Sequence, residues 1–361
     1  MLYFIFLAVL AIQYEFTPFR NSYLLIGVTI LLALLAGFRD SSVSKDYYNY
    51  QYVFDTIYYI TGSNAAGSSD FRYLLFFEPG FVAIILLFRS FFEFNYGLAI
   101  MVFYAISSLS IKVYAINRLS VNPYLTLLFY FSYFFLFYEM TQVRIGLASA
   151  IVLISFISLL KGKKMVFAGM ILFATCFHYS AIFYLLILLF NTSKFNRNLY
   201  VIILALSLLL GFVKLPLLNV FGSVDPSDIS AKLNSYVELS ENVTINVFNS
   251  LNICNILCCF YLLFSLSKEN LYADKRLILF LKCNIFSIFL LSFLSGAPAF
   301  SLRFSQLFSI AQIFVFPYLV KYLPVKKLNV FILVLVAGAF FYVAQFYGHL
   351  LNPYKISSIK Y

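Results

Sequence analysis

The run IGLASAIVLISFISLL, residues 145–160, decides the fold of this chain. It carries no charged side chain and shows no alternation of apolar and polar residues. A basic connector, KGKK at 161–164, follows it and leads into a second apolar run at 165–190. A membrane strand would alternate over about ten residues, whereas a helix crosses the bilayer with about 20 consecutive apolar residues. Continuous blocks of this kind predict transmembrane helices.

The whole chain has the same character. Of its 361 residues, 63% are hydrophobic and 11% are charged, and the mean hydropathy is +0.93. Soluble domains are roughly 45–50% apolar and about 25% charged. This composition excludes a water-soluble monomer, a disordered chain and a nucleic-acid-binding protein. The net charge of +11 is explained by Lys and Arg gathering in short cytoplasmic loops.

Cysteine and histidine are too few, and too badly placed, for a metal centre or a disulfide framework. The five cysteines all lie within apolar blocks, and their odd number argues against paired disulfides. Only two histidines are present, and no pair of aspartates has the spacing typical of a metal site. We therefore expect no metal and no cofactor.

The apolar blocks predict an all-α, polytopic transmembrane helical bundle with about 10–12 spans, forming a single integral membrane domain over residues 1–361. The N-terminus is predicted outside and the basic connectors inside. No positive segment precedes the first block, so a signal peptide is not expected. The predicted spans are 1–14, 23–38, 96–117, 124–138, 145–160, 199–213, 248–266, 277–295, 302–320 and 328–347.

Four segments depart from simple spans. Residues 39–77 and 214–246 are predicted to be external loops, the second long enough to fold over a site. Residues 165–190 are broken near Cys176–Ser180 and have basic loops on both sides, which predicts a re-entrant hairpin. Residues 78–94 are interpreted as re-entrant or interfacial, with Arg89 and Glu93 unassigned.

Under this topology, the polar residues that interrupt the apolar pattern converge on the external face. A charged side chain within the bilayer costs at least about 2.5 kcal/mol, so it usually marks a site or pathway. Several arginines near one surface favour a phosphate-bearing ligand, such as a lipid-linked diphosphate. Tyrosines between 47 and 59 could stack on sugars or form an interfacial aromatic belt. The main polar candidates are Arg39, Asp46, Tyr47, Tyr50, Glu139, Arg144, His178 and Arg303.

Each candidate also has a simpler structural explanation. Arg39 could anchor a helix end by reaching toward water, and Arg144 could pair with Glu139. Asp46 could cap the helix that follows it, and His178 could be a satisfied turn residue. Arg303 has no acidic neighbour in the sequence, so a purely structural explanation is weakest for this residue.

At these residues the chain resembles the EpsG family of bacterial exopolysaccharide polymerases, which are similar in role to Wzy-type O-antigen polymerases. The resemblance spans nearly the whole chain and depends on the order and spacing of short motifs. These motifs are Gly37-Phe-Arg39 with Asp46-Tyr47 and Tyr50, Glu78-Pro-Gly80, Arg144-x-Gly-x-Ala148, Phe177-His178-Tyr-Ser180-Ala181, and Arg303 with Pro317.

The resemblance implies polymerisation of undecaprenyl-diphosphate-linked oligosaccharide repeat units into exopolysaccharide, O-antigen or capsule. The reaction would take place at the external face of the bacterial cytoplasmic membrane. A sugar hydroxyl of one unit would attack the anomeric carbon of another, and the lipid diphosphate would leave. A flippase and a chain-length regulator are the candidate protein partners, beside membrane lipid.

For this reaction, Arg144 and Arg303 are the candidates to bind the diphosphate, with Arg39 sharing the role. Asp46 or His178 would be the general base, and we favour Asp46 because an acceptor would arrive at a sugar-facing loop. The predicted catalytic residues are therefore Asp46, His178 and Arg144. The predicted substrate-binding residues are Arg39, Tyr47, Tyr50, Glu78, Glu139 and Arg303.

Three alternatives remain. A flippase for lipid-linked oligosaccharide would use the same arginines but should show internal repeats or paired broken helices. A polysaccharide acyltransferase with His178 as base would need a carboxylate partner, and none is nearby in the sequence. A ligase would differ only in its acceptor.

Overall fold

The computed structural model describes residues 2–16, 21–62, 74, 77–92, 95–190, 192–215, 245–322 and 325–357. Nearly all regular structure in these ranges is helical, beside an isolated antiparallel bridge between Arg39 and Ile356. The all-α prediction is confirmed.

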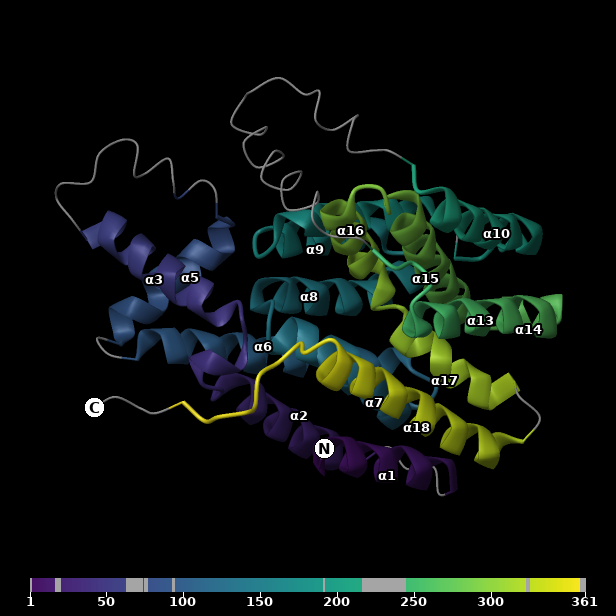
Figure 1. Ribbon diagram of the computed structural model, residues 1–361, viewed down its shortest axis with the longest axis horizontal. Helices are drawn as coiled ribbons and strands as arrows, with labels where there is room; N and C mark the ends of the chain where they lie inside the picture. Colours follow the sequence, from purple (N-terminus) through teal and green to yellow (C-terminus); the bar gives the residue numbers. More distant parts are fainter. Residues whose placement is uncertain are drawn as a thin grey trace. The chain divides into compact units, whose positions relative to one another are not determined.

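The chain forms two compact units, which are coloured by sequence in Figure 1. Unit 1 contains Met1–Leu185 together with Val330–Tyr361, and unit 2 contains Leu186–Asn329. That the chain is one integral membrane domain stays a prediction.

Unit 1 is built around α6, which packs against α2, α5 and α8; α8 in turn packs against α9. The elements of its long N-terminal part are α1 (Leu2–Phe16), α2 (Ser22–Gly37), η1 (Ser41–Val43), α3 (Tyr47–Gly62), α5 (Pro79–Phe91), α6 (Tyr96–Leu119), α7 (Pro123–Phe129), the π-helix η2 (Tyr130–Glu139), α8 (Val143–Leu160) and α9 (Lys164–Thr175). The 3₁₀-helix η3 (Tyr179–Leu189) begins in unit 1, and α18 (Lys326–Tyr342) with η4 (Val343–Tyr347) lies mostly in it.

Unit 2 is centred on α15, which packs against α10, α16 and α17. Its helices are α10 (Arg197–Val213), α13 (Ser250–Ser265), α14 (Lys268–Tyr272), α15 (Lys275–Phe293), α16 (Pro298–Ser309) and α17 (Gln312–Tyr322).

Short polar side chains set where many of these helices begin. Asn122 accepts a hydrogen bond from the Leu125 amide at 3.0 Å, and Pro123 follows it at the first helical position. Asn21, Asn196, Asn249 and Asp274 cap α2, α10, α13 and α15 in the same way.

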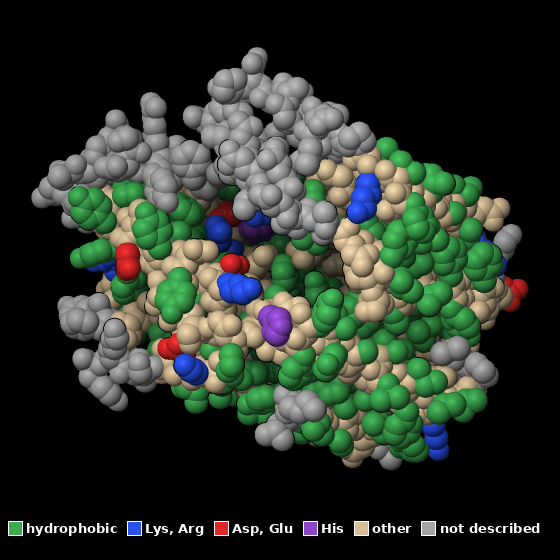
Figure 2. All heavy atoms as spheres, in the orientation of Figure 1, with side chains coloured by type: hydrophobic (Ala, Val, Ile, Leu, Met, Phe, Trp, Pro, Cys, Tyr) green, Lys and Arg blue, Asp and Glu red, His purple; other side chains and the backbone are tan. Residues whose placement is uncertain are grey.

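Length and composition mark the chain as a multi-pass membrane protein. Among the described residues, 4 helices can cross a bilayer, or up to 5 if the pair α16–α17, bent by 49°, counts as one span. The four are Tyr96–Leu119, Val143–Leu160, Lys275–Phe293 and Lys327–Tyr347. Shorter apolar helices of 10–17 residues lie at the predicted spans 1–14, 23–38, 199–213 and 248–266. The predicted span 124–138 consists of α7 followed by η2. Hydrophobic side chains dominate the surface seen in Figure 2, which suits contact with lipid.

The structure adds detail to two segments. The predicted loop 39–77 contains the helix α3, because its tyrosines and apolar residues recur at helical spacing. The predicted single span 302–320 is broken at Ile310 and Ala311, between α16 and α17.

The predicted break in 165–190 is confirmed: α9 and η3 are separated by a turn at Cys176–His178. Whether this pair re-enters the membrane stays a prediction. Most of the loop 214–246, and Glu93, lie outside the described residues.

Candidate functional site

A carboxylate at the start of α5 joins two segments of unit 1 that are far apart in the sequence. Oε2 of Glu78 lies 2.6 Å from Nη1 of Arg144, and Oε1 lies 3.2 Å from Nδ1 of His178. The Tyr179 amide also donates to Oε1, at 3.4 Å. The Glu78 side chain is 5% exposed, whereas those of Arg144 and His178 are 28% and 24% exposed. The buried Glu78 carboxylate therefore orients two partly exposed groups, the Arg144 guanidinium and the His178 imidazole.

The local sequence explains how Glu78 reaches this position. Glu78 is the N-cap residue of α5, and Pro79 occupies the first turn, where a missing amide proton costs nothing. The Gly80 amide donates to the Cys176 carbonyl at 2.8 Å. A Cβ at Gly80 would lie 2.8 Å from that same oxygen. Only glycine allows so close an approach, so the motifs at 78–80 and 176–179 fit directly against each other.

Glu78 is ionised at neutral pH. It lies outside the candidate spans. Burial alone would raise the pKa of its carboxyl, but the hydrogen bond with His178 and the charge of Arg144 lower it to about 2. Glu78 thus acts as a fixed negative charge rather than as a proton donor.

The Arg144 guanidinium is a cation held between aromatic rings and the Glu78 carboxylate. Its guanidinium lies over the ring of Phe81 at 4.9 Å and near that of Tyr50 at 5.8 Å. Its Nε is buried and has no hydrogen-bond partner among the described residues. Glu78 engages Nη1 and Tyr50 also hydrogen-bonds to the guanidinium, so an anion would bind at the edge of Arg144 that stays exposed.

His178 is held through one ring nitrogen. When Nδ1 donates its proton to Glu78, Nε2 is the basic nitrogen. No carboxylate is near His178 in the sequence, but the fold brings Glu78 to it from 100 positions away.

Glu139 belongs to a second, closed network. Its Oε1 lies 2.5 Å from Nζ of Lys112 and accepts the Tyr130 hydroxyl at 2.5 Å and the Ser108 hydroxyl at 2.9 Å. Both charged side chains are at most 1% exposed. The suggested pairing of Arg144 with Glu139 is wrong. Substrate contact by Glu139 stays a prediction, and these contacts give it no support.

Arg39 is fully buried, so its explanation as an anchor that reaches water is wrong. It donates to the Ala36 carbonyl and lies 5.4 Å from the Tyr47 ring centre. A C-terminal segment pairs with the backbone around it: the Asp40 amide donates to the Lys355 carbonyl at 2.9 Å. Substrate binding by Arg39 stays a prediction.

The other predicted residues have different surroundings. Tyr50 is buried and packs edge-on against Phe81 at 6.2 Å, which places it in the cluster. Asp46 directly precedes α3 and accepts the Tyr50 amide through its carbonyl at 3.1 Å. Arg303 is exposed on α16 in unit 2, so its convergence with Arg144 stays a prediction.

Sequence reasoning missed Lys112 entirely. It lies in α6, one of the candidate spans, and its Nζ donates to the Gly146 carbonyl at 2.8 Å. A lone lysine inside an apolar run is itself the signal that would have found it. No group of three or more His, Cys, Asp or Glu within the described ranges could hold a metal ion.

Comparison with known proteins gives one family. The model of the EpsG family matches residues 22–356, which include Glu78, Arg144 and His178. No curated protein and no solved structure matches the chain.

Proposed function

Because the chain belongs to the EpsG family, we propose that it is a polysaccharide polymerase of the bacterial cytoplasmic membrane. Its substrates are undecaprenyl-diphosphate-linked oligosaccharide repeat units, which it joins at the external face. The product is exopolysaccharide, O-antigen or capsule.

The cluster of Glu78, Arg144 and His178 carries this proposal. It sets a partly exposed guanidinium beside a partly exposed imidazole and orients both through one carboxylate. Transfer from a lipid diphosphate needs this combination: a cation where negative charge develops, and a base for the attacking hydroxyl.

In the proposed step, an acceptor hydroxyl oxygen forms a bond to the anomeric carbon of the donor sugar. The bond from that carbon to the diphosphate oxygen breaks, and the lipid diphosphate leaves with the bonding electrons. Nε2 of His178 takes the hydroxyl proton, and Glu78 stabilises the imidazolium that results. Arg144 stabilises the charge that grows on the departing diphosphate. Here we favour His178 over Asp46 as the base, because Glu78 fixes its ring.

The pairing of His178 with Glu78 also favours a second candidate, a polysaccharide acyltransferase. In that reaction the same imidazole would deprotonate a sugar hydroxyl for attack on an acyl carbon. Arg144 beside the imidazole favours a diphosphate leaving group, and the product distinguishes the two reactions.

The test uses purified protein in vesicles with lipid-linked repeat units. We expect a ladder of glycan lengths from wild-type protein. Arg144→Ala should lower the rate by about 10²–10³-fold, because a charge-stabilising donor is lost. Arg118→Ala, at an exposed arginine in the last turn of α6, is the matched control. No ladder, with repeat units crossing the vesicle membrane instead, would refute the polymerase and support a flippase.

The two histidines allow a matched test of the base. We expect His178→Gln to lower kcat by about 10²–10⁴-fold. His349→Gln should leave kcat unchanged. A full-length ladder at an unchanged rate from His178→Gln would exclude this histidine as the base.

A further inference from the structure

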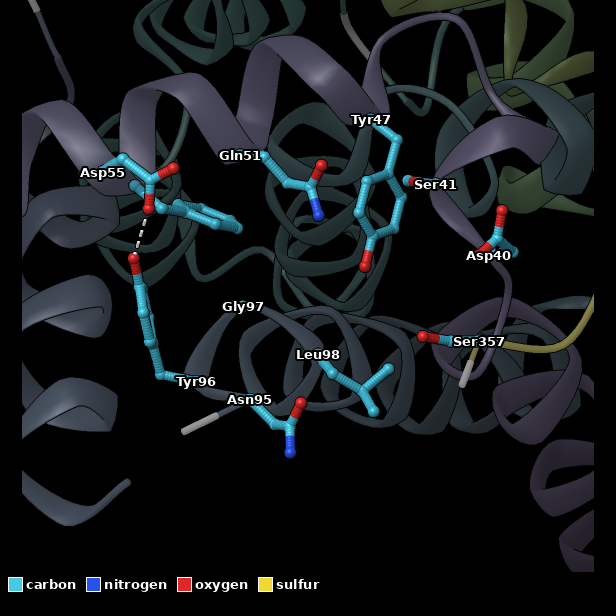
Figure 3. Close-up of a pocket in the computed structure, with 11 residues that line it drawn as sticks. Asp40, Ser41, Tyr47, Gln51, Asp55, Asn95, Tyr96, Gly97, Leu98 and Ser357 are labelled. Carbon is cyan, nitrogen blue, oxygen red and sulfur yellow. Dashed lines mark hydrogen bonds between the residues drawn. The ribbon is translucent and has the colours of Figure 1, made fainter. Parts of the chain in front are cut away.

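A separate polar cavity lies within unit 1, beside α3. Its volume is about 440 Å³, within the roughly 300–1,000 Å³ typical of small-ligand sites. As Figure 3 shows, α3 lies along one side and the first residues of α6 along the other, with Asp40 and Ser357 at one end.

The lining favours a neutral polar ligand. Asp40, Asp55, Gln51 and Asn95 supply carboxylates and carboxamides, while Tyr47 and Tyr96 add aromatic rings. Lys and Arg are missing from the lining given by the described residues. Cations lie beside the lining rather than in it: Lys355 acts on Asp40, and Arg89 lies 6.0 Å from the Tyr96 ring. The two lining carboxylates disfavour a diphosphate, whereas vicinal sugar hydroxyls can both donate to a carboxylate and accept from a carboxamide.

Both carboxylates are held in place by one of their oxygens. Oδ1 of Asp55 accepts the Tyr96 hydroxyl at 2.6 Å, the contact drawn as a dashed line in Figure 3. Oδ1 of Asp40 accepts the Ser42 hydroxyl at 2.7 Å and the Ser42 amide at 3.0 Å. The side-chain hydrogen bond from Ser42 is the main reason that the pKa of Asp40 is lowered. Among the described residues, the hydrogen bond to Asp55 engages Oδ1, so its Oδ2 can accept a ligand hydroxyl.

The helix α3 connects this cavity to the cluster. Tyr47, Gln51 and Asp55 recur at every fourth position and extend into the cavity in Figure 3. Tyr50 and Phe54 pack on Phe81, at 6.2 and 6.0 Å, and Phe81 lies beneath the Arg144 guanidinium. The cavity and the cluster therefore contact opposite sides of one helix within the same unit.

We propose that this cavity binds a neutral sugar residue of the acceptor repeat unit, through Gln51 and Asp55, while the diphosphate of the donor is held at Arg144. This inference rests on the proposed function. It separates the two substrates by charge: the anionic group goes to the cation, and the uncharged glycan goes to the acidic cavity.

The binding test uses full-length protein in detergent and saturation-transfer difference NMR. The probes are methyl glycosides of neutral hexoses and N-acetylhexosamines, with inorganic pyrophosphate and CaCl₂ as comparison ligands. We expect at least one glycoside to bind without competition from pyrophosphate. Gln51→Ala and Asp55→Asn should each weaken binding by up to about tenfold, the effect of one lost hydrogen bond. Asn49→Ala, on the exposed face of the same helix, should leave it unchanged.

Asp55→Asn is suited to this test because an amide oxygen can still accept the Tyr96 hydroxyl, which keeps the fold. Binding of Ca²⁺ without any glycoside, or equal glycoside binding by all variants, would overturn the inference. In the polymerase assay, Gln51→Ala should raise the KM for acceptor and leave kcat nearly unchanged. If wild-type protein makes a ladder and the acceptor KM is unaltered in Gln51→Ala and Asp55→Asn, the sugar site alone is refuted. If wild-type protein makes no ladder, the proposed polymerase function is refuted, and the NMR binding data still test whether the cavity binds a sugar.

Discussion

Glu78 is the residue on which the cluster depends, because it is the shared counter-charge of Arg144 and His178. Glu78→Gln keeps the shape but leaves the Arg144 cation partly buried without its partner. We expect a loss of about 1–3 kcal/mol in the free energy of unfolding, measured by thermal denaturation in detergent. Glu269→Gln, at an exposed glutamate on α14, is the control. Equal stability of the two variants would contradict the role given to Glu78.

The lowered pKa of Glu78 also predicts a pH dependence. Its folded value of about 2 lies below the ordinary 4.5, so the charged form stabilises the fold. That contribution is complete above pH 4.5 and is lost as pH falls from 4.5 toward 2. Melting curves across this range should show the stability of wild-type protein converging on that of Glu78→Gln. A stability difference between wild type and Glu78→Gln that stays constant down to the lowest pH would contradict the lowered pKa of Glu78.

Lys112 and Glu139 form a buried ion pair, so the stability effects of replacing each residue alone should not add up to the effect of replacing both. Lys112→Met leaves a buried carboxylate unpaired and should cost about 3–5 kcal/mol. The double variant Lys112→Met with Glu139→Gln removes both charges and should recover much of that loss. A double-mutant cycle with chemical denaturation measures the coupling, and additive effects would argue against a tight pair.

At the level of residues, the sequence identified Arg144 and His178 because charge and imidazole are rare in so apolar a chain. It also named Glu78 as a candidate, but it could not show that Glu78 is their common partner. Glu78 is separated from them by 66 and 100 positions, and no local pattern encodes a contact over that distance.

At the level of elements, the junction of α5 with the turn at 176–178 depends on Gly80. In Gly80→Ala the new methyl group would press on the Cys176 carbonyl, so we expect a loss of about 1–3 kcal/mol together with reduced activity. Gly169→Ala on α9 meets nothing within 4 Å and should be neutral or stabilising. The two variants are compared by melting temperature. A Gly80→Ala protein as stable as wild type would mean that the two motifs can separate freely.

The ends of helices were predictable where a long apolar run meets polar neighbours, even without a side-chain cap. Residues 96–117 and 145–160 match α6 and α8 closely because each is a long apolar run with polar neighbours. The break within 302–320 was not predictable, since Ile310 and Ala311 interrupt neither the apolar pattern nor the helical propensity. Within the predicted loop 39–77, a possible cap at Asp46 was the sequence's indication of a helix, and α3 begins directly after it.

For the whole molecule, a C-terminal segment completes unit 1. Asn352 donates from its backbone to the Val43 carbonyl at 3.0 Å and from its side chain to the Ser42 carbonyl at 2.8 Å. Deleting 349–361 should therefore lower the melting temperature and weaken glycoside binding, because the Asp40 side of the cavity loses its support. Asn352→Ala should produce a smaller change in the same direction. Unaltered binding by the truncated protein would show that the cavity forms without this segment.

The division of unit 1 also sets an order of events during synthesis. The ribosome makes Met1–Leu185, then the whole of unit 2, and only then Val330–Tyr361. At about 5–20 residues per second, the early helices wait on the order of ten seconds for the last ones. During that interval the backbone groups at 38–43 that later bind 352–357 have no such partner. The C-terminal side of the cavity therefore forms only after the whole of unit 2 has been made.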